Sequence, residues 1–484
     1  MLFNSVQFMF VFLPVVLAGF FVLGWLRQPT PAVLWLGLAS LVFYGWDDPY
    51  RLLPIILTSI AYNFAVGRML VRRPSRGLLA IGICGNLLLL GYFKYAGFLT
   101  DVFSTATGMA VSRPDVTLPI GISFFSFTQI AFLVDAFRGE AREYKPWHYL
   151  LFVTFFPHLV AGPIYHHKEI MPQFDRTETF RFDVSNVSLG LTWFALGLAK
   201  KVMLADPIAS YATPVFAAAA AGNPVGFVDS WIGVLSFTLQ IYYDFSGYSD
   251  MAIGLALMIG VRFPLNFNSP YKATSLIDFW RRWHMTLSQF LRDYLYIPLG
   301  GNRKGPRRRF INLMVVMLLG GLWHGAAWNF VVWGGLHGLG LAANHAWHKV
   351  AEPRGLALPA PAAWVLTFGF VVLAWVAFRA DNLPTALALW KSMAGVNGFN
   401  PAESVVAGQI AGAMSLLAGL LALALVAPNT QQLFSYPGDV GARLEQPLQW
   451  RPRPGWALAV GLLFGAALSF VITQRPTEFL YFKF

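Results

Sequence analysis

The feature that most constrains this chain is a series of long apolar runs with few or no charged residues. The first, residues 2–26, contains no Asp, Glu, Lys or Arg. A helix needs about 20 consecutive apolar residues to cross the hydrocarbon core of a bilayer. Because 56% of the 484 residues are apolar and 12% are charged, the chain can supply on the order of ten such helices. The sequence therefore predicts an all-α, polytopic integral membrane protein and excludes a conventional water-soluble enzyme.

The apolar runs extend over almost the whole chain, so we expect one integral-membrane domain over residues 1–484. Several runs are short or contain proline, which is typical of re-entrant or broken helices that line a cavity or are buried in protein. We expect roughly 11–14 transmembrane or re-entrant helices around a central funnel. The runs are residues 2–26, 31–46, 52–67, 77–98, 118–137, 149–164, 187–199, 227–243, 251–261, 313–336, 361–378, 405–426 and 456–472.

The charge distribution predicts the orientation and argues against a nucleic-acid partner. The formal net charge is +12, but the basic residues lie in short loops between apolar runs, as the positive-inside rule requires. The arginines that follow the third run place that loop in the cytoplasm and the N-terminus in the periplasm. The one cysteine, Cys84, excludes a disulfide within the chain and a cysteine-based metal site.

The most basic stretch contains an amphipathic pattern over residues 274–296, where apolar residues recur at steps of four and three. We expect one helix at the cytoplasmic membrane boundary. On its wheel His284 falls in the apolar arc beside Trp280, either as a core histidine bonded to a backbone carbonyl or as a functional one. Arg281 and Arg282 on the opposite face either anchor the helix or bind an anionic cofactor.

The run over residues 313–336 (LMVVMLLGGLWHGAAWNFVVWGGL) has His324 as its only ionisable side chain. A polar group at membrane depth is costly unless it pairs or lines a water-filled path, so such a histidine indicates a functional site. The alternative is a histidine that only bonds across helices, although Ser, Thr or Asn does so at less cost. We expect the buried ring to be neutral, which is the form that a general base requires.

Two further positions could belong to the same cavity. His158 lies between two prolines in an apolar segment, which fits either a broken helix that enters a cavity or a histidine at a helix end. Within residues 242–250 (YYDFSGYSD), Asp250 is placed to cap a helix that begins at residue 251. Asp244 has no such capping role and could face the cavity.

The remaining sequence signals are weaker. The pairs His166–His167 and His345–His348 favour solvated surface, because neither has the neighbouring carboxylates or cysteines of a metal site. The sequence has no Walker loop, dinucleotide fingerprint or GxSxG nucleophile elbow. Two classes of function fit these residues: a transferase that uses histidine as a base, and a transporter that uses it as a proton relay.

Longer motifs separate these two classes, because they closely resemble the membrane-bound O-acyltransferase family. They are residues 242–250, 279–284 (FWRRWH), 291–303 (LRDYLYIPLGGNR) and 319–325 (LGGLWHG). Within that family the chain is similar to the bacterial alginate O-acetyltransferase branch. That similarity rests on residues 2–5 (LFNS), 91–95 (GYFKY), 118–124 (LPIGISF), 156–163 (FPHLVAGP) and 478–484 (EFLYFKF).

The resemblance implies transfer of an acetyl group from a cytoplasmic thioester through a membrane funnel toward an exported polysaccharide, with alginate favoured over cellulose and peptidoglycan. It implies that His324, which matches the near-invariant histidine of the family, is the general base. His284 takes the position of its partner residue, and His158 matches a histidine of the alginate branch. We expect the following residues to support the reaction or line the funnel: His158, Asp244, Trp323 and Trp280.

The resemblance also implies which donor substrate and which partners this protein has. The donor is acetyl-CoA or another acetyl thioester, whose phosphates the basic face around Arg281, Arg282 and Arg303 would attract. We expect no bound cofactor or metal. The expected partners are the lipid bilayer of the bacterial inner membrane, a periplasmic acetyltransferase and the machinery of polysaccharide synthesis or export. The alternatives are a D-alanyl transferase of the teichoic acid type and a transporter of an activated acyl group.

Overall fold

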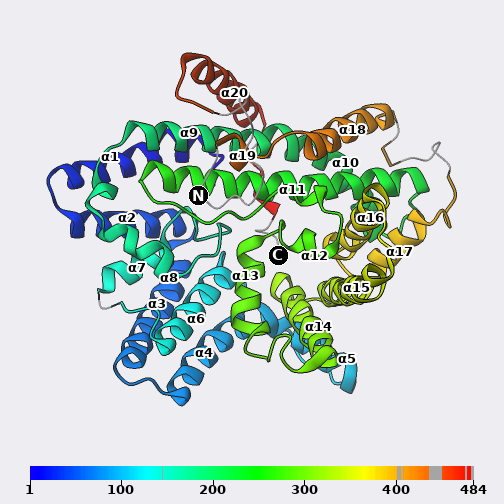
Figure 1. Cartoon of the computed structure of the whole chain (residues 1–484), viewed down its shortest axis with the longest axis horizontal. Coiled ribbons are helices and arrows are strands. Elements are labelled where there is room, and N and C mark those ends of the chain that lie inside the picture. The colour runs from blue at the N-terminus through cyan, green and yellow to red at the C-terminus, as the bar shows by residue number, and fades with distance from the viewer. Residues whose placement is uncertain (144, 400–404, 407, 435–449, 475–476, 481–484) are drawn as a thin grey trace. The chain divides into compact units, whose positions relative to one another are not determined.

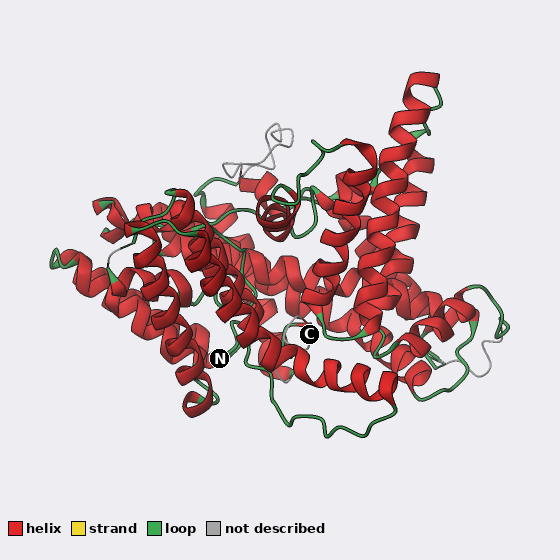
Figure 2. Cartoon of the chain, turned by 90° about the horizontal axis from the view of Figure 1, so that it is seen from below, coloured by secondary structure: helices red, strands yellow, loops and turns green. Residues whose placement is uncertain are grey.

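The structure is a computed structural model that describes residues 1–143, 145–399, 405–406, 408–434, 450–474 and 477–480. Throughout this part of the chain the regular secondary structure is helical, and no strand is present (Figure 2). The prediction of an all-α protein is therefore confirmed. The last four residues of the motif at 478–484 lie outside the described residues.

Contacts between Cα atoms divide the chain into two compact units, each assembled from separate stretches of sequence. Unit 1 comprises Met1–Ala199, Tyr248–Leu265 and Arg451–Lys483, and unit 2 comprises Lys200–Gly247 and Asn266–Trp450 together with the final residue. The expectation of one domain over residues 1–484 stays a prediction.

Unit 1 is built mainly from helices of the first 199 residues (Figure 1). Its helices are η1 (Phe8–Phe12), α1 (Leu13–Trp25), α2 (Pro29–Tyr44), α3 (Pro49–Arg72), α4 (Arg76–Leu90), η2 (Gly91–Tyr95), α5 (Ala96–Thr107), α6 (Ile122–Arg138), α7 (Pro146–Thr154), α8 (His167–Ile170), η3 (Met171–Asp175), η4 (Thr177–Phe180), α9 (Val184–Ala199) and α20 (Pro454–Thr473).

Unit 2 contains the histidines that the sequence analysis ranks first. Its helices are η5 (Lys200–Ala205), α10 (Asp206–Ala220), most of α11 (Phe227–Met258), η6 (Pro270–Lys272), α12 (Leu276–Trp280), α13 (Met285–Leu291), η7 (Arg292–Tyr296), α14 (Gly305–His324), α15 (Trp328–Ala351), η8 (Glu352–Arg354), α16 (Ala360–Arg379), α17 (Leu383–Met393), α18 (Ile410–Val426) and α19 (Thr430–Phe434).

Within the described residues, six helical stretches are long and apolar enough to cross a membrane. They are Phe8–Trp25, Pro49–Arg72, Arg76–Thr107, Val184–Ala220, Ala360–Arg379 and Pro454–Thr473, and α2 and α18 are shorter apolar helices. The chain is therefore a multi-pass membrane protein, as its composition predicts. The larger expected number also includes re-entrant helices and stays a prediction.

Polar side chains inside the candidate spans of unit 1 are paired with one another. Asn63 of α3 and Asn86 of α4 exchange two hydrogen bonds, with N···O distances of 3.0 and 2.6 Å. Both side chains are buried, and each also donates to a backbone carbonyl of its own helix. Because hydrocarbon offers no substitute partner, this pair stabilises the packing of α3 on α4.

The apolar run over residues 313–336 contributes to two helices and is not a single span. α14 ends at His324, Gly325 adopts an extended conformation, and α15 begins at Trp328, so that two helices pack side by side (Figure 1). A Cβ atom on Gly321 would lie 2.3 Å from the Phe330 carbonyl oxygen, and one on Gly334 would lie 2.3 Å from the Met317 carbonyl oxygen. The absence of a side chain at Gly321 and Gly334 therefore allows α14 and α15 to approach closely.

A substitution pair on α15 tests this close approach. Gly334→Ala should lower the free energy of unfolding by about 1–3 kcal/mol, because the new methyl group meets the backbone of α14 and cannot be accommodated by a side-chain rotation. Gly335→Ala is the matched control, since its methyl group would meet only Leu318 Cδ2 at 3.7 Å. Unfolding in SDS, followed by tryptophan fluorescence, measures both variants, and equal stability of the two would contradict the tight crossing.

For the motif at residues 242–250, the prediction that a helix begins at residue 251, capped by Asp250, is wrong. α11 runs without a break from Phe227 to Met258, so Ser249 and Asp250 lie inside the helix and Asp250 is not an N-cap. The polar residues of this motif are buried within the helix faces, not gathered in a loop. Tertiary packing of these polar side chains allows the helix to continue through the motif.

Candidate active site

The structure brings together the two histidines that the sequence analysis ranks first. His284 lies between α12 and α13, and His324 is the last residue of α14. Their ring centroids are 6.5 Å apart, and both side chains are buried. The two residues are separated by 40 positions in the sequence, so their proximity depends on the packing of α14 against the segment that carries His284.

The predicted continuous helix over residues 274–296 is wrong, because the chain breaks at His284. That residue has φ of +42°, in the left-handed region that non-glycine residues rarely occupy. α12 therefore ends at Trp280, and α13 starts in a new direction at Met285. Such a conformation costs on the order of 1–3 kcal/mol and persists only where neighbouring structure holds it.

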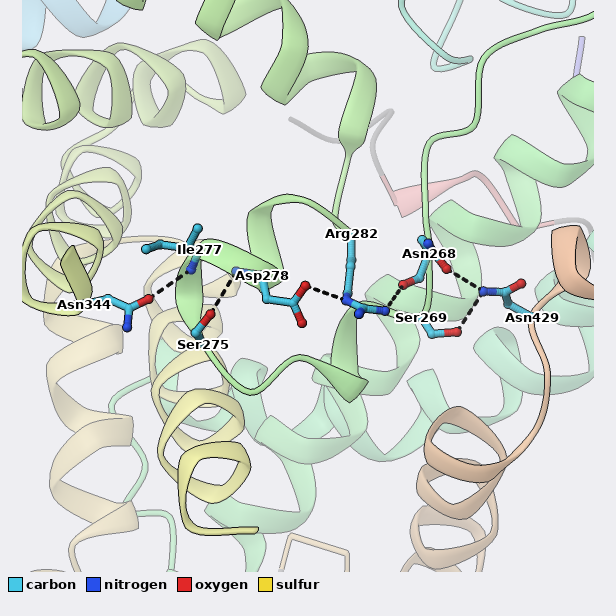
Figure 3. A network of polar contacts seen from close by, with 8 residues as sticks. All are labelled: Asn268, Ser269, Ser275, Ile277, Asp278, Arg282, Asn344 and Asn429. Atoms are coloured by element: carbon cyan, nitrogen blue, oxygen red, sulfur yellow. Dashed lines mark hydrogen bonds and ion pairs between the residues drawn. The ribbon is translucent and has the colours of Figure 1, made fainter. Parts of the chain in front are cut away.

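Hydrogen bonds from residues 266–268 hold this break in place. The Asn268 amide donates to the Arg282 carbonyl oxygen at 2.8 Å, and the Met285 amide donates to the Asn266 carbonyl oxygen at 2.9 Å. Arg282 also bonds Asp278 at 2.8 Å and the Asn268 carbonyl oxygen at 3.3 Å (Figure 3). These bonds lie on both sides of the break and explain why the helical periodicity failed to predict it.

Asn266 fixes the imidazole of His284. The Thr286 amide and hydroxyl both donate to Asn266 Oδ1, at 3.4 and 3.0 Å, so this atom is the amide oxygen. His284 Nδ1 lies 3.0 Å from the same oxygen, which can only accept, and therefore the ring hydrogen is on Nδ1. The lone pair of the neutral ring is on Nε2. No local sequence signal indicated Asn266, which precedes His284 by 18 residues.

Aromatic rings surround His324. The ring centroids of Trp323, Trp333 and Phe378 lie 4.9, 5.1 and 5.1 Å from that of its imidazole. These rings come from α14, α15 and α16. A reaction centre with such walls excludes bulk water, which strengthens every electrostatic interaction inside it. The expected role of Trp323 in supporting the reaction or lining the funnel stays a prediction.

A third histidine, His337, belongs to the same cluster, and the sequence analysis missed it. It is completely buried on α15, and its ring centroid lies 4.8 Å from that of Trp333. Trp280 donates its indole hydrogen to His337 Nδ1 at 3.2 Å, so the ring hydrogen of His337 is on Nε2. Trp280 thus positions a histidine. The spacing of Trp333 and His337, one helical turn apart, was the signal available in the sequence.

Asp244 takes part in a buried ion cluster in unit 2. Lys201 Nζ lies 2.7 Å from Asp244 Oδ1 and 2.8 Å from Asp206 Oδ1. The side chains of Lys201 and Asp244 are each 2% exposed, and that of Asp206 is 13% exposed. This pairing gives Asp244 a structural task that the sequence did not reveal, whereas its place on a funnel wall stays a prediction.

The three arginines assigned to donor phosphates have different surroundings. Arg281 and Arg303 are exposed, while Arg282 is half-buried and bonded to Asp278 and to the Asn268 carbonyl oxygen. A guanidinium engaged in this way has fewer donors left for a ligand. Attraction of the donor phosphates by this face stays a prediction, and it depends more on Arg281 and Arg303 than on Arg282.

His158 lies in unit 1 and is completely buried in the turns that follow α7. Its Nδ1 donates to the Pro163 carbonyl oxygen at 2.7 Å, and its Nε2 lies 3.2 Å from Thr128 Oγ1. The ring also packs on Tyr165, with a centroid distance of 4.1 Å. Both ring nitrogens thus have hydrogen-bond partners within the protein, which gives His158 a structural task in shaping this turn.

The expectation of solvated surface at His166 and His167 is wrong. His167 is buried, and its Nε2 lies 3.2 Å from Glu143 Oε2, while His148 Nδ1 lies 3.6 Å from the same oxygen. Burial alone would raise the pKa of Glu143, but hydrogen bonds from His148, His167 and the Lys145 amide lower it to about 2. His166 Nδ1 lies 3.6 Å from the buried Asp135 carboxylate. Among the described residues, no group of three or more His, Cys, Asp or Glu side chains could hold a metal ion.

Comparison with known proteins identifies the family. The model of the membrane-bound O-acyltransferase (MBOAT) family matches residues 78–383, which include all the histidines discussed above. The chain belongs to this family. It is therefore an O-acyltransferase of the membrane, and the His284–His324 pair lies within the part of the chain that defines the family.

Individual MBOAT proteins share much of the chain. The peptidoglycan O-acetyltransferase of Helicobacter pylori is 42% identical over 429 residues, which cover 82% of this chain and 80% of that protein. A probable alginate O-acetylase of Pseudomonas aeruginosa is 43% identical over 404 residues, covering 81% of this chain and 75% of that protein. The teichoic acid D-alanyltransferase of Streptococcus thermophilus is 27% identical and covers 54% of this chain and 68% of its own length.

Proposed function

We propose that this MBOAT protein transfers an acetyl group from a thioester donor toward hydroxyl groups of an exported polysaccharide. The observation that carries the proposal is the pairing of His284 and His324, with ring centroids 6.5 Å apart and both side chains buried among aromatic rings. The names of the relatives from Helicobacter pylori and Pseudomonas aeruginosa support O-acetylation of a polysaccharide. Alginate is the favoured polymer, and peptidoglycan and cellulose are the alternatives.

In the proposed reaction, His324 acts as a general base. Its neutral imidazole takes the proton from an acceptor hydroxyl, and the oxygen attacks the carbonyl carbon of the acetyl thioester. The tetrahedral intermediate then collapses, the carbon–sulfur bond breaks, and the leaving thiolate takes the proton from the imidazolium. The products are an acetyl ester and the thiol of the donor, so atoms and charge balance without a further reactant.

The hydrogen-bond pattern of His284 favours a positioning role over stabilisation of the oxyanion. Because the ring hydrogen lies on Nδ1 and is directed to Asn266, Nε2 can accept a hydrogen bond but cannot donate one to a negatively charged oxygen. An accepting nitrogen near His324 is suited to bind a neighbouring hydroxyl of the acceptor, which leaves the single hydrogen of the attacking hydroxyl to His324. His284 thus orients the nucleophile that His324 deprotonates.

The proposal also includes the location of the enzyme in the cell and the partners with which it acts. The donor, acetyl-CoA or another acetyl thioester, enters from the cytoplasm, where the basic segment at residues 271–310 attracts its negative charge. The protein lies in the bacterial inner membrane with its N-terminus in the periplasm. A periplasmic acetyltransferase receives the acetyl group, and the polysaccharide synthesis or export machinery delivers the polymer.

Reconstituted vesicles test the proposed function. The full chain is supplied with radiolabelled acetyl-CoA, periplasmic extract of the native cell, and either deacetylated alginate or peptidoglycan fragments. We expect an alkali-labile acetyl ester on the polymer, and none in vesicles without the protein. Label that crosses the membrane without forming an ester would support a transporter, and transfer of D-alanine from a carrier protein would support a D-alanyl transferase; either result alone would overturn the proposal.

Variants of Asn266 test the positioning of His284. Asn266→Asp should move the pH of half-maximal transfer upward, because a carboxylate beside Nδ1 favours the protonated imidazole. Asn266→Ala should lower kcat by about 10–100-fold through misorientation, with little change in the donor KM. The pH–rate profile and KM of each variant are measured together. A loss of activity without any displacement of the profile in Asn266→Asp would leave Asn266 with a structural role only.

A further inference from the structure

Unit 2 contains a cationic cavity apart from the histidine cluster. Its volume is about 490 Å³, and it is formed where the start of α14 meets the last turns of α15. The residues that line it include Asn302, Pro306, Arg309, His345, His348 and Lys349. Among the three arginines at 307–309, only Arg309 is a lining residue, and it is less exposed than the other two.

The positive charges that line this cavity favour binding of an anion. The Arg309 guanidinium hydrogen-bonds His345 Nδ1, so His345 accepts through this nitrogen and its ring is neutral. Within the described part of the chain, neither Arg309 nor Lys349 forms an ion pair with a carboxylate. Two permanent cations therefore face one small space. A phosphate group matches the fork of the arginine and the point charge of the lysine.

An apolar cavity of about 810 Å³ adjoins the cationic one, because His348 lines both. Its other lining residues include Leu276, Leu339, Gly340, Ala343, Leu366 and Phe370, from the start of α12, from α15 and from α16. Leu339, Leu366 and the lining residue Trp347 are also exposed. Exposed apolar side chains at the edge of this cavity are suited to contact lipid chains.

Three polar atoms of the apolar cavity already bond to backbone groups. Ser275 Oγ accepts from the Asp278 amide, and Asn344 Oδ1 accepts from the Ile277 amide (Figure 3). Thr367 Oγ1 donates to the Ala363 carbonyl oxygen. A nucleoside would need such atoms as its own hydrogen-bond partners, whereas a hydrocarbon chain needs none. The walls therefore favour an acyl chain over the adenosine of a nucleotide donor.

We propose that these two cavities bind one anionic phospholipid. Its phosphate lies between Arg309 and Lys349, and one acyl chain enters the apolar cavity past His348. The site is distinct from the His284–His324 pair, and the inference does not depend on the proposed acetyl transfer. Because α14 carries both Arg309 and His324, a bound lipid would also brace the helix that positions the histidine.

Native mass spectrometry of the delipidated full chain, with added dioleoylphosphatidylglycerol or dioleoylphosphatidylcholine, tests the charged part of the site. The wild type should bind the anionic lipid about tenfold more tightly or better. Arg309→Gln/Lys349→Gln should remove this preference. Arg307→Gln/Arg308→Gln is the matched control, since it removes the same charge from exposed residues outside the cavity, and it should keep the preference within twofold. Equal losses in the two double variants would overturn the site in favour of general surface attraction.

A second variant tests the apolar part without changing charge. Ala343→Phe places a ring in the larger cavity and should weaken binding of the anionic lipid about tenfold or more, whereas Ala343→Ser should not. Unaltered binding in Ala343→Phe would contradict an acyl chain in this cavity. In a separate experiment, acetyl-CoA is added to the wild-type protein in competition with the anionic lipid. Displacement of the lipid by an equimolar amount of acetyl-CoA would overturn the proposal, because the cavities would then hold the nucleotide donor.

Discussion

Acetyl transfer by His324→Ala is expected to fall by about 10²–10⁴-fold, because the loss of a positioned general base removes a contribution of that size. The decrease should appear in kcat, since the imidazole acts on the acceptor proton and does not hold the donor. Initial rates of ester formation in vesicles measure it, with the amount of folded protein determined in the same sample. His324→Gln should be equally inactive, because an amide of similar length can accept a hydrogen bond but cannot take the proton.

Two results would count against this role. A kcat within about threefold of the wild-type value in either variant would exclude His324 as the base. A rise in the donor KM at unchanged kcat would assign the residue to binding. His166→Gln serves as the control, because it changes a histidine of unit 1 that lies outside the cluster and is bonded to Asp135. That variant should retain transfer within about twofold of the wild-type rate.

Lys201→Met is expected to cost about 3–5 kcal/mol of unfolding free energy, because it leaves the buried carboxylate of Asp244 and the partly buried carboxylate of Asp206 without their shared cation. Asp244→Asn should cost less, since Lys201 keeps Asp206 as a partner at 2.8 Å. Unfolding in SDS, followed by tryptophan fluorescence, measures the stability of both variants. The specific prediction is that Lys201→Met loses more stability than Asp244→Asn. Removal of the lysine leaves two carboxylates without their shared cation, whereas removal of one carboxylate leaves the lysine paired with the other.

The double variant Lys201→Met/Asp244→Asn gives an independent check. Removing the cation and one carboxylate together leaves only Asp206, the most exposed of the three side chains. The double variant should therefore be more stable than Lys201→Met alone, a coupling typical of charges in contact. Losses that simply add, or a larger loss in Asp244→Asn than in Lys201→Met, would contradict the shared ion cluster.

The class of protein could be predicted from composition and apolar runs, because the bilayer imposes a length and an apolarity on every span. The burial of His284 and His324 could be predicted too, since each lies among apolar residues at helical spacing. Helix boundaries could not. The break at His284 depends on hydrogen bonds from residues 266–268, and the break after His324 places Gly321 against α15. Such boundaries are decided by tertiary contacts that periodicity does not describe.

The residues that support the histidines were the hardest to foresee. Asn266 orients His284 from a segment without regular structure, and Lys201 neutralises Asp244 from 43 positions away. The prediction of a helix cap at Asp250 is wrong, because a local pattern cannot show whether a polar side chain is buried within a continuous helix. His337 was missed because it lies one position beyond the apolar run as the sequence defined it. Its spacing from Trp333 was a usable signal.

A double-mutant cycle on His284 and His324 tests most directly whether the two rings act on one reaction. Rates of acetyl ester formation are measured for His284→Ala, His324→Ala and the double variant, each corrected for folded protein. If the rings act as a unit, the double variant should be no slower than the slower single variant, because the second substitution removes nothing that is still used. Losses that multiply in the double variant would show that the two histidines contribute independently, and would contradict a joint site.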